Sequence, residues 1–519
     1  MGVVVRTVSG ELRGTVVGSR PDGVVSFLGV PYAAPPFGVN RLRPPQPVQA
    51  WAGVRDASAL GAEPPQVAPP TPTGPPAGAG EDWDDVGAAF EAVERAAPTE
   101  DCLNLNLWTP SPDAAGLPVM VWIQGGMFEL SSTAAYDGSR FARDDVVCVV
   151  INWRPGAEGF LYVDDGIANL GLLDQVAALE WVRENIAAFG GDPGNVTVFG
   201  ESAGAMSIRM LLAMPRAQGL FRRAILQSGA AHQVTPAQDA LRIAQDLAAR
   251  LGVTPTRDAI ADVGVSRLLT AQAELKADLL ADPDPQRWGA AVATSTMPWQ
   301  PVIDGDVLPA RPMDLITAGA ARDIDVIVGT NTDDWRLWLV VSGAIAAITD
   351  EILTGPAATY GYQSIAAYGL TPQTALAAYR ARYPEAGPGH LLTKVQTDWW
   401  MRIPALSLAE AHVNATSRTY MYEFAWPSPG LGAVHALEVP FVFDTLSPGA
   451  PLFGPLLGPH PPQQLADVIH AAWISFARTG DPGWPAYDLE RRATMRFDTP
   501  SQVVDDPRPW ERTLWRGLR

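Results

Sequence analysis

One serine lies in a pattern that is typical of a covalent catalyst. The pentapeptide Gly-Glu-Ser-Ala-Gly occupies 200–204, directly after the branched apolar run 196–199 and before an apolar helical segment. A strand, a sharp turn and a helix in this order project a hydroxyl above the edge of a sheet, and Gly200 and Gly204 let the strand and the helix approach closely. The start of a helix also favours developing negative charge. We therefore predict that Ser202 is a nucleophile, although the bare motif would also fit a glycine-flanked helix start.

A serine hydroxyl needs a base to remove its proton, and histidine is the usual base near neutral pH. Among the six histidines, His435 lies in a Gly-rich loop late in the chain, just before the apolar run 439–443. Hydrolases of the strand–turn–helix type have the chain order serine, acid, histidine. His435 is therefore the predicted base, and a solvated or capping histidine is the alternative. The other five lie in helical patterns, in Gly/Pro loops or after a strand: His232, His390, His412, His460 and His470.

The acid that orients the imidazole should follow a strand between the serine and the histidine. Asp333 and Asp334 stand in tandem shortly after the apolar run 326–328. Adjacent residues at the end of a strand point in different directions, so only one of these carboxylates can reach His435. The other is expected to face solvent or to cap the next helix.

Ester and amide chemistry also needs donors for the oxyanion. In this class of fold, one donor is the amide of the residue after the nucleophile, here Ala203, and others come from a glycine-rich loop after an early strand. Gly125 and Gly126 follow the apolar run 119–123 and supply such a loop. The alternative for the loop alone is a Gly-Gly hairpin turn.

The elements that must position these groups form an α/β pattern. Short branched runs at 119–123, 146–151, 196–199 and 326–328 suit strands that are covered on both faces, as in a mostly parallel sheet. Between the second and third runs, apolar residues from Leu172 to Phe189 recur every three or four positions, which predicts a helix. Strand, crossover helix and strand form a βαβ unit, so we predict an α/β fold with a wound, mostly parallel sheet flanked by helices.

We interpret the 519 residues as one large unit, 1–519, with two segments of different texture. Residues 62–99 are rich in Pro and Gly and then acidic, which predicts an excursion at the rim of the site. Residues 335–418 alternate helical patterns with Gly/Pro breaks and contain several Trp residues, which predicts a mostly helical cap layer over the sheet.

The composition of the chain bears on which kinds of partner it can bind. The net charge of −19 repels nucleic-acid phosphates and anionic lipids, so we expect no nucleic-acid or membrane partner. The first residues contain no apolar segment of signal-peptide length, so we expect a cytoplasmic protein, and we expect a monomer. Cys102 and Cys148 allow at most one disulfide, and Cys148 lies in a strand-like run that favours a buried structural thiol. The predicted chemistry needs no metal and no cofactor.

Beyond these features, long motifs across nearly the whole chain resemble the type-B carboxylesterases. This branch of the α/β-hydrolases includes the bacterial para-nitrobenzyl esterases and the cholinesterases. Besides the serine pentapeptide, the matching motifs lie at 26–36, 100–106, 169–175, 189–194 and 432–441.

The resemblance implies roles for particular residues. It implies Ser202 as nucleophile, His435 as base and Asp334, at the position of the family acid, as the third member of the triad. The implied oxyanion donors are the amides of Gly126, Met127 and Ala203. Glu201, Glu438 and Ser228 are implied to lie near the site in a hydrogen-bond network, and the implied buried ion pairs are Arg154 with Asp174 and Arg41 with Glu100.

Among the departures from the family pattern, three lie at or near the predicted site residues. The acid is usually Glu, and Asp334 is one methylene shorter. Gln124 stands where His or Tyr is common, and Met127 stands where Gly or Ala is common. The Met127 side chain is expected to narrow the pocket and to weaken acceptance of esters of tertiary alcohols.

The sequence thus predicts a serine carboxylic-ester hydrolase that acts through an acyl-enzyme on small to medium hydrophobic esters, with aryl esters as a hypothesis. An amidase or carbamate hydrolase with the same triad, or a non-catalytic binding protein of this fold, is the alternative. Because the base must be neutral, activity is expected to rise through a pKa near the ordinary value of ~6.5.

Overall fold

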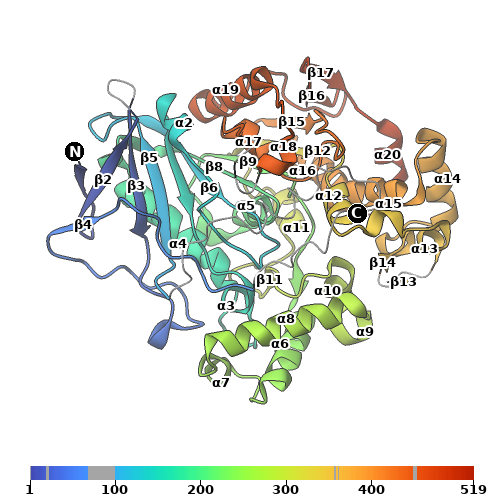
Figure 1. The fold of residues 1–519 in the computed structure, drawn as a ribbon, viewed down its shortest axis with the longest axis horizontal. Coiled ribbons are helices and arrows are strands. Elements are labelled where there is room, and N and C mark those ends of the chain that lie inside the picture. The colour runs from blue at the N-terminus through green and yellow to red at the C-terminus, as the bar shows by residue number, and fades with distance from the viewer. Residues whose placement is uncertain are drawn as a thin grey trace.

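A 13-stranded sheet runs through the computed structural model, with helices on both of its faces (Figure 1). The structure describes residues 2–18, 23–67, 100–355, 358–359, 362–447, 450 and 453–518. Most of the predicted rim excursion, from 68 to 99, therefore lies outside the described residues.

The sheet is parallel in its centre and antiparallel toward its edges. Neighbouring strands pair in parallel from β7 through β6, β8, β9, β12 and β15 to β16. The strands, in sheet order, are β1 (Gly2–Arg6), β2 (Glu11–Val17), β3 (Val24–Pro31), β5 (Asn104–Thr109), β7 (Val147–Ile151), β6 (Leu117–Ile123), β8 (Gly191–Glu201), β9 (Arg223–Gln227), β12 (Asp325–Asn331), β15 (Thr419–Phe424), β16 (Ala493–Phe497) and β17 (Gln502–Asp505), with β4 (Val54–Asp56) paired to β2. The prediction of a mostly parallel α/β sheet is confirmed, and each of the four predicted runs forms one of its strands.

Strand β6 shows why the central strands are apolar without interruption. Val119, Val121 and Ile123 belong to the hydrophobic core on one face of the sheet, and Met120 and Trp122 belong to the core on the other face. Because both faces are covered, alternation with polar residues is absent from this strand, as expected for a buried parallel strand.

Helices cover the sheet and also form two separate layers. The predicted crossover helix is α4 (Leu170–Asn185), followed by a 3₁₀ turn at Ile186–Phe189. The segment 335–418 contains α12 (Arg336–Val341), α13 (Asp350–Thr354), α14 (Pro372–Arg382), α15 (Pro388–Thr397), a π-helical turn (Asp398–Arg402) and α16 (Ile403–His412). The other α-helices of the described residues are α2 (Ser139–Arg143), α3 (Gly156–Phe160), α5 (Ala203–Ala213), α6 (Ala237–Leu251), α7 (Arg257–Ala261), α8 (Val265–Ala281), α9 (Pro285–Trp288), α10 (Ala290–Ser295), α11 (Pro312–Thr317), α17 (Val439–Val442), α18 (Gly454–Leu457), α19 (Gln463–Thr479) and α20 (Pro509–Leu514).

The layer formed by α6 to α10 was not distinguished in the sequence analysis. Figure 1 shows these helices together at the lower end of the molecule, away from the central sheet. The segment has no composition shift that would separate it from the α/β pattern. His390 also lies in α15, although its Gly/Pro surroundings favoured a loop.

Two buried ion pairs were implied by the resemblance, and one of them is wrong. Arg154 pairs with Asp174 at 2.7 Å, and both side chains are almost fully buried. Arg41 pairs at 2.7 Å with Glu158, not with Glu100, which is exposed. Glu158 is a buried residue of α3, and its Oε1 accepts from both Nε and Nη2 of Arg41, at 2.9 and 2.7 Å. Both cysteines are buried free thiols.

Candidate active site

Ser202 occupies the sharp turn between β8 and α5. Its backbone has φ 55° and ψ −125°, a conformation that side-chain-bearing residues rarely adopt. A Cβ on Gly204 would lie 1.8 Å from the carbonyl oxygen of Ile123, and one on Gly200 would lie 2.5 Å from the same oxygen. The two flanking glycines are therefore required because the turn presses strand β6 against the start of α5.

The side chains predicted to act together come from neighbouring parallel strands. Ser202 follows β8, the glycine loop follows β6, Asp334 follows β12 and His435 follows β15. Since β6, β8, β9, β12 and β15 are consecutive neighbours in the sheet, their carboxyl ends meet along one edge. Ligand sites of open α/β sheets form at this edge.

Asp334 and His435 form a buried hydrogen bond. Nδ1 of His435 donates to Oδ1 of Asp334 at 2.8 Å, and the two residues are 0% and 5% exposed. The other carboxylate oxygen accepts from the Ser228 hydroxyl at 3.0 Å and from the Asn331 amide at 2.8 Å. These three bonds fix the carboxylate although its side chain is shorter than the family's usual Glu.

Asp333 turns away from His435. Its carboxylate accepts from Nζ of Lys394 at 2.6 Å and from the hydroxyl of Thr332 at 3.1 Å. The aspartate that does not reach the histidine was expected to face solvent or to cap the next helix. The Asp333 side chain does neither, because it is bound by Lys394 and Thr332. The bond to Lys394 attaches the loop that carries both aspartates to helix α15.

The second ring nitrogen of His435 faces another carboxylate. Nε2 lies 2.8 Å from Oε1 of Glu201, and the hydrogen bonds of the described residues include none between His435 and Ser202. Burial disfavours the charged imidazole, but the carboxylates of Glu201 and Asp334 outweigh it and raise the pKa of His435 to about 10. This arrangement therefore favours the charged imidazole, and the expected rise of activity through a pKa near the ordinary value stays a prediction.

Glu438 belongs to the same buried cluster. Its carboxylate accepts from the side-chain amides of Asn331 at 2.6 Å and Gln227 at 3.2 Å. Burial, together with the negative charges of Glu201 and Asp334, raises the pKa of Glu438 to about 8. Asn331 and Gln227 were not predicted, and their positions at the ends of β12 and β9 were the available signal.

The glycine loop after β6 has an unusual backbone. Gly126 has φ 128°, and a Cβ there would lie 2.5 Å from the carbonyl oxygen of Leu130. Met127 and Phe128 follow with φ 56° and 60°. Phe128 is fully buried against Phe160, with ring centroids 5.1 Å apart, so packing holds the loop in this strained form. Among the described hydrogen bonds, none has the amide of Gly126 or Met127 as its donor.

An ion pair braces this loop from outside. Nζ of Lys276, in α8, donates to Oε1 of Glu129 at 3.0 Å and to the carbonyl oxygen of Thr296 at 2.9 Å. Glu129 lies two residues after Met127. The helical layer formed by α6 to α10 therefore contacts the loop that carries two predicted oxyanion donors.

Three tryptophans extend from His435 into the helical cap segment. The ring of Trp338 lies 4.6 Å from the imidazole, Trp335 lies 4.4 Å from Trp338, and Trp400 stacks on Trp335 at 4.5 Å and 17°. These residues form an aromatic wall beside the predicted base. The tryptophans of this segment are visible in the sequence, but nothing local in the sequence indicates their contact with His435.

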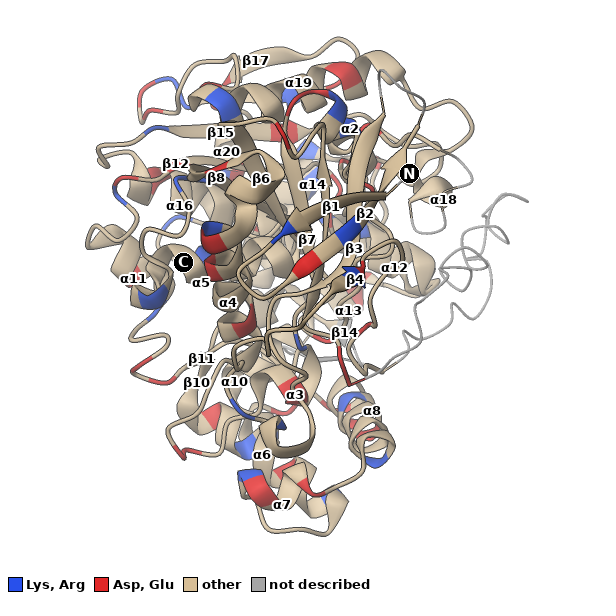
Figure 2. Ribbon diagram, turned by 90° about the vertical axis from the view of Figure 1, so that its left-hand side faces the viewer, with Lys and Arg blue, Asp and Glu red and all other residues tan. Residues whose placement is uncertain are grey.

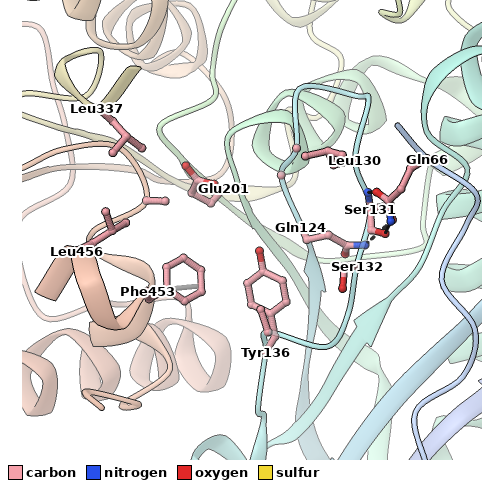
Figure 3. Close-up of a pocket in the computed structure, with 14 residues that line it drawn as sticks. Gln66, Gln124, Leu130, Ser131, Ser132, Tyr136, Glu201, Leu337, Phe453 and Leu456 are labelled. Atoms are coloured by element: carbon pink, nitrogen blue, oxygen red, sulfur yellow. Dashed lines mark hydrogen bonds between the residues drawn. The ribbon is translucent and has the colours of Figure 1, made fainter. Parts of the chain in front are cut away.

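A cavity of about 200 Å³ opens beside the glycine loop and Glu201 (Figure 3). Its lining residues are Gln66, Gln124, Gly125, Gly126, Leu130, Ser131, Ser132, Ala135, Tyr136, Glu201, Leu337, Ala436, Phe453 and Leu456. Within the part of the chain that the structure describes, no group of three or more His, Cys, Asp and Glu side chains is arranged as a metal site.

Comparison with known proteins decides the family. The family model described as "Carboxylesterase family" matches residues 2–515. The chain belongs to the carboxylesterase family. The para-nitrobenzyl esterase of Bacillus subtilis is 36% identical over 509 residues, which are 95% of each chain. The human cocaine esterase is 32% identical over 94% of this chain and 86% of its own.

Solved structures agree with this membership. The carboxylesterase EST55 of Geobacillus stearothermophilus covers 99% of this chain and 100% of its own, with a TM-score of 0.80 and 35% identity. A structure of "PNB esterase" covers 98% and 99% with a TM-score of 0.79 and 34% identity. The resemblance to the type-B carboxylesterases and the α/β-hydrolase fold are thus confirmed.

Family membership also establishes the reaction class. The protein is a carboxylesterase, and hydrolysis of carboxylic esters through a serine acyl-enzyme is general for the family. The alternative of a non-catalytic binding protein is thereby set aside. The roles of individual residues stay predictions.

Proposed function

We propose that Ser202, His435 and Asp334 form the catalytic triad of this carboxylesterase. The observation that carries the proposal is the buried hydrogen bond from His435 Nδ1 to Asp334, beside the turn that presents Ser202. A carboxylate at Nδ1 fixes the tautomer and the orientation of the imidazole and stabilises its charged form. Asp333 pairs with Lys394 instead, which supports Asp334 as the acid.

Catalysis then requires His435 to exchange one contact for another. Nε2 must lose its proton and turn from Glu201 to the Ser202 hydroxyl, and catalytic hydrogen bonds of this kind often tighten only when substrate is bound. Ser202 Oγ attacks the ester carbonyl carbon while His435 takes the hydroxyl proton. His435 then gives that proton to the leaving alcohol. Water attacks the acyl-enzyme with the same histidine as base, which releases the acid and restores Ser202.

The amides of Gly126, Met127 and Ala203 are the proposed oxyanion donors. Ala203 is the first residue of α5, where a helix has amides without a partner inside the helix. The Gly126 and Met127 amides belong to the loop that is held by the buried Phe128. Rigid donors of this kind each contribute about 10²–10³ to turnover.

Hydrophobic esters of small to medium size, aryl esters among them, are the proposed substrates. Trp338 lies beside His435 and is partly exposed, so a flat aromatic group can stack on it next to the reacting carbonyl. A panel of p-nitrophenyl esters with straight and aromatic acyl groups tests this proposal. Equal kcat/KM for acetate and benzoate, unchanged in Trp338→Ala, would contradict it.

Labelling with a fluorophosphonate tests the triad directly. We expect one covalent adduct at Ser202, located by peptide mass spectrometry, and no adduct in Ser202→Ala. Ser207, which lies on α5 and is fully buried, offers a matched control, because Ser207→Ala should label like the wild type. An adduct on another residue, or full esterase activity in Ser202→Ala, would contradict the assignment.

The cytoplasmic location, the monomeric state and the absence of a nucleic-acid partner expected from the sequence are likewise proposals. Lys and Arg residues are scattered among Asp and Glu residues in Figure 2 and form no single basic area in that view, which supports the last of them. Within the described part of the chain, no helix is long and apolar enough to cross a membrane. Cell fractionation and light scattering test the first two.

A further inference from the structure

The cavity beside Glu201 lies where the leaving alcohol must go. In the proposed mechanism, Nε2 of His435 gives its proton to the alcohol oxygen, so that oxygen must come within hydrogen-bond reach of Nε2. Nε2 lies 2.8 Å from Glu201, which lines the cavity together with Ala436, the residue after His435. Gly125 and Gly126 of the oxyanion loop line it as well. The cavity therefore receives the alcohol portion of the ester if the proposed triad is correct.

The cavity is apolar except for a few polar groups. Leu130, Leu337, Phe453 and Leu456 contribute carbon surface, and the Tyr136 hydroxyl points into the space between Gln124 and Glu201 (Figure 3). Burial raises the pKa of Tyr136 above its usual range, so this hydroxyl keeps its proton. A few polar groups within apolar walls are typical of sites that discriminate among small ligands.

Gln124 has an unused hydrogen-bonding atom at this cavity. The residue is 1% exposed, and its Nε2 donates to the Ser131 hydroxyl at 2.8 Å. The same hydroxyl oxygen accepts from the amide of Trp153 at 3.3 Å. Oε1 of Gln124 is buried and has no hydrogen-bond partner among the described residues. Buried acceptors are almost always paired in folded proteins, so we expect Oε1 of Gln124 to accept a hydrogen bond from a group outside the described residues.

The neighbouring polar residues do not offer the same opportunity. The Ser132 hydroxyl donates to Glu63, and Gln66 is held at both ends of its side-chain amide by the backbone of Ser131. Oε1 of Glu201 already lies 2.8 Å from Nε2 of His435, so Oε1 of Gln124 is the remaining unpaired acceptor among the lining side chains. Because this oxygen is buried in the cavity wall, the Gln124 side chain must turn toward the cavity for a ligand hydroxyl to reach it.

We propose that Gln124 is a specificity residue that selects alcohol groups bearing a hydroxyl. Esters of small diols and polyols are then preferred over esters of simple alkanols of equal size. This inference rests on the proposed function, because it needs His435 as the proton donor to the leaving alcohol. Its chemical basis is that the ligand hydroxyl donates to Oε1, whereas an alkyl group leaves that acceptor buried without a partner.

Paired benzoate esters provide the test. The 2-hydroxyethyl and propyl esters have the same acyl group and nearly the same size. In the wild type we expect kcat/KM to favour 2-hydroxyethyl benzoate by about tenfold, the size of one hydrogen bond to a buried acceptor. In Gln124→Met, which keeps the length and removes both polar atoms, we expect this ratio to fall to near one. Ser132→Ala is the matched control and should keep the wild-type ratio.

A third ester shows whether donation is what matters. The ether oxygen of 2-methoxyethyl benzoate accepts but does not donate, so it should gain nothing over butyl benzoate. A preference for the methoxyethyl ester, or a hydroxyethyl preference that survives in Gln124→Met, would overturn the proposal.

Failure of the inference and failure of the triad give different results. If Ser202→Ala still hydrolyses the benzoates, the proposed triad is wrong. If Ser202→Ala is inactive, its equilibrium binding of the two esters provides a second readout. Tighter binding of the hydroxyethyl ester that disappears on adding Gln124→Met supports the inference, and equal binding in both backgrounds overturns it.

Discussion

His435 is held by a carboxylate at each of its ring nitrogens, and these two contacts set its charge. Asp334 lies 2.8 Å from Nδ1 and Glu201 lies 2.8 Å from Nε2. The first contact suits a catalytic base, and the second favours the charged imidazole, which cannot act as a base. Variants of Asp334 and of Glu201 should therefore change the kinetics of ester hydrolysis in different ways.

The role of Asp334 can be separated from that of its neighbour. We expect Asp334→Asn to lower kcat by about 10⁴, because the wrong imidazole tautomer is then favoured. Asp333→Asn should keep most of the activity, since Asp333 contacts Lys394 and not His435. Ester hydrolysis by both variants, with circular dichroism to verify folding, checks this. An inactive Asp333→Asn beside a normal Asp334→Asn would reverse the assignment.

Glu201 should control the pH at which the enzyme becomes active. Its negative charge contributes to raising the pKa of His435 to about 10, so its loss should lower that pKa by about 1–3 units. A base with a lower pKa becomes neutral at lower pH. We therefore expect the rising limb of kcat/KM to move to lower pH in Glu201→Gln. A profile of kcat/KM between pH 5 and 10 measures the shift, and an unmoved or higher limb would contradict it.

Met127 should limit the size of the alcohol next to the oxyanion donors. It has φ 56°, which glycine adopts without strain, so Met127→Gly removes the side chain while tolerating the backbone. We expect about a tenfold gain in kcat/KM for tert-butyl esters relative to n-butyl esters. No relative gain would show that the Met127 side chain lies outside the path of the substrate.

At the scale of elements, the turn between β8 and α5 depends on contact between backbones. The sequence predicts this turn because the strand, the two glycines and the helix follow one another directly along the chain. It could not find Glu158 as the partner of Arg41, because the two residues are 117 positions apart and nothing local marks the pairing. Asn331 and Gln227 were missed for the same reason, since they join the site through their places in the sheet.

Gly204 provides a test of this backbone contact. A Cβ there would meet the Ile123 carbonyl oxygen at 1.8 Å, which forces β6 and α5 apart. We expect Gly204→Ala to lower the free energy of unfolding by more than ~3 kcal/mol or to prevent folding. Gly264→Ala is the control, because the space around Gly264 is open and its φ is −56°. Urea unfolding of both variants compares them, and equal stability would contradict the expected clash.

At the scale of the molecule, the parallel sheet and its apolar cores were predictable, and the layers around it were less so. Uninterrupted apolar runs predict strands that are buried on both faces, as in β6 and β7. The longer helices α6 and α8 have ordinary amphipathic patterns that do not reveal where they dock. The positions of the site residues along one sheet edge follow from strand order, which the sequence alone does not specify.

For the buried pair Arg154–Asp174, losing one partner should lower the free energy of unfolding more than losing both. Arg154→Met leaves the carboxyl group of Asp174 without its arginine partner at 0% side-chain exposure, which should cost about 3–5 kcal/mol. Replacing both residues, as Arg154→Met with Asp174→Leu, should recover much of that loss because no lone charge remains. Denaturant unfolding of the single and double variants measures this. A double variant no more stable than Arg154→Met would contradict the argument.

The chain contains two lysines among 519 residues, and both brace loops that flank the site. Lys276 holds the oxyanion loop through Glu129, and Lys394 holds the aspartate loop through Asp333. Besides the terminal α-amine, amine-directed reagents therefore meet two lysine side chains, and each of them contacts a loop that carries groups of the proposed site. Coupling of either lysine to an aldehyde- or ester-activated resin would break its ion pair with Glu129 or Asp333. Coupling through surface carboxylates away from the site would leave both ion pairs intact.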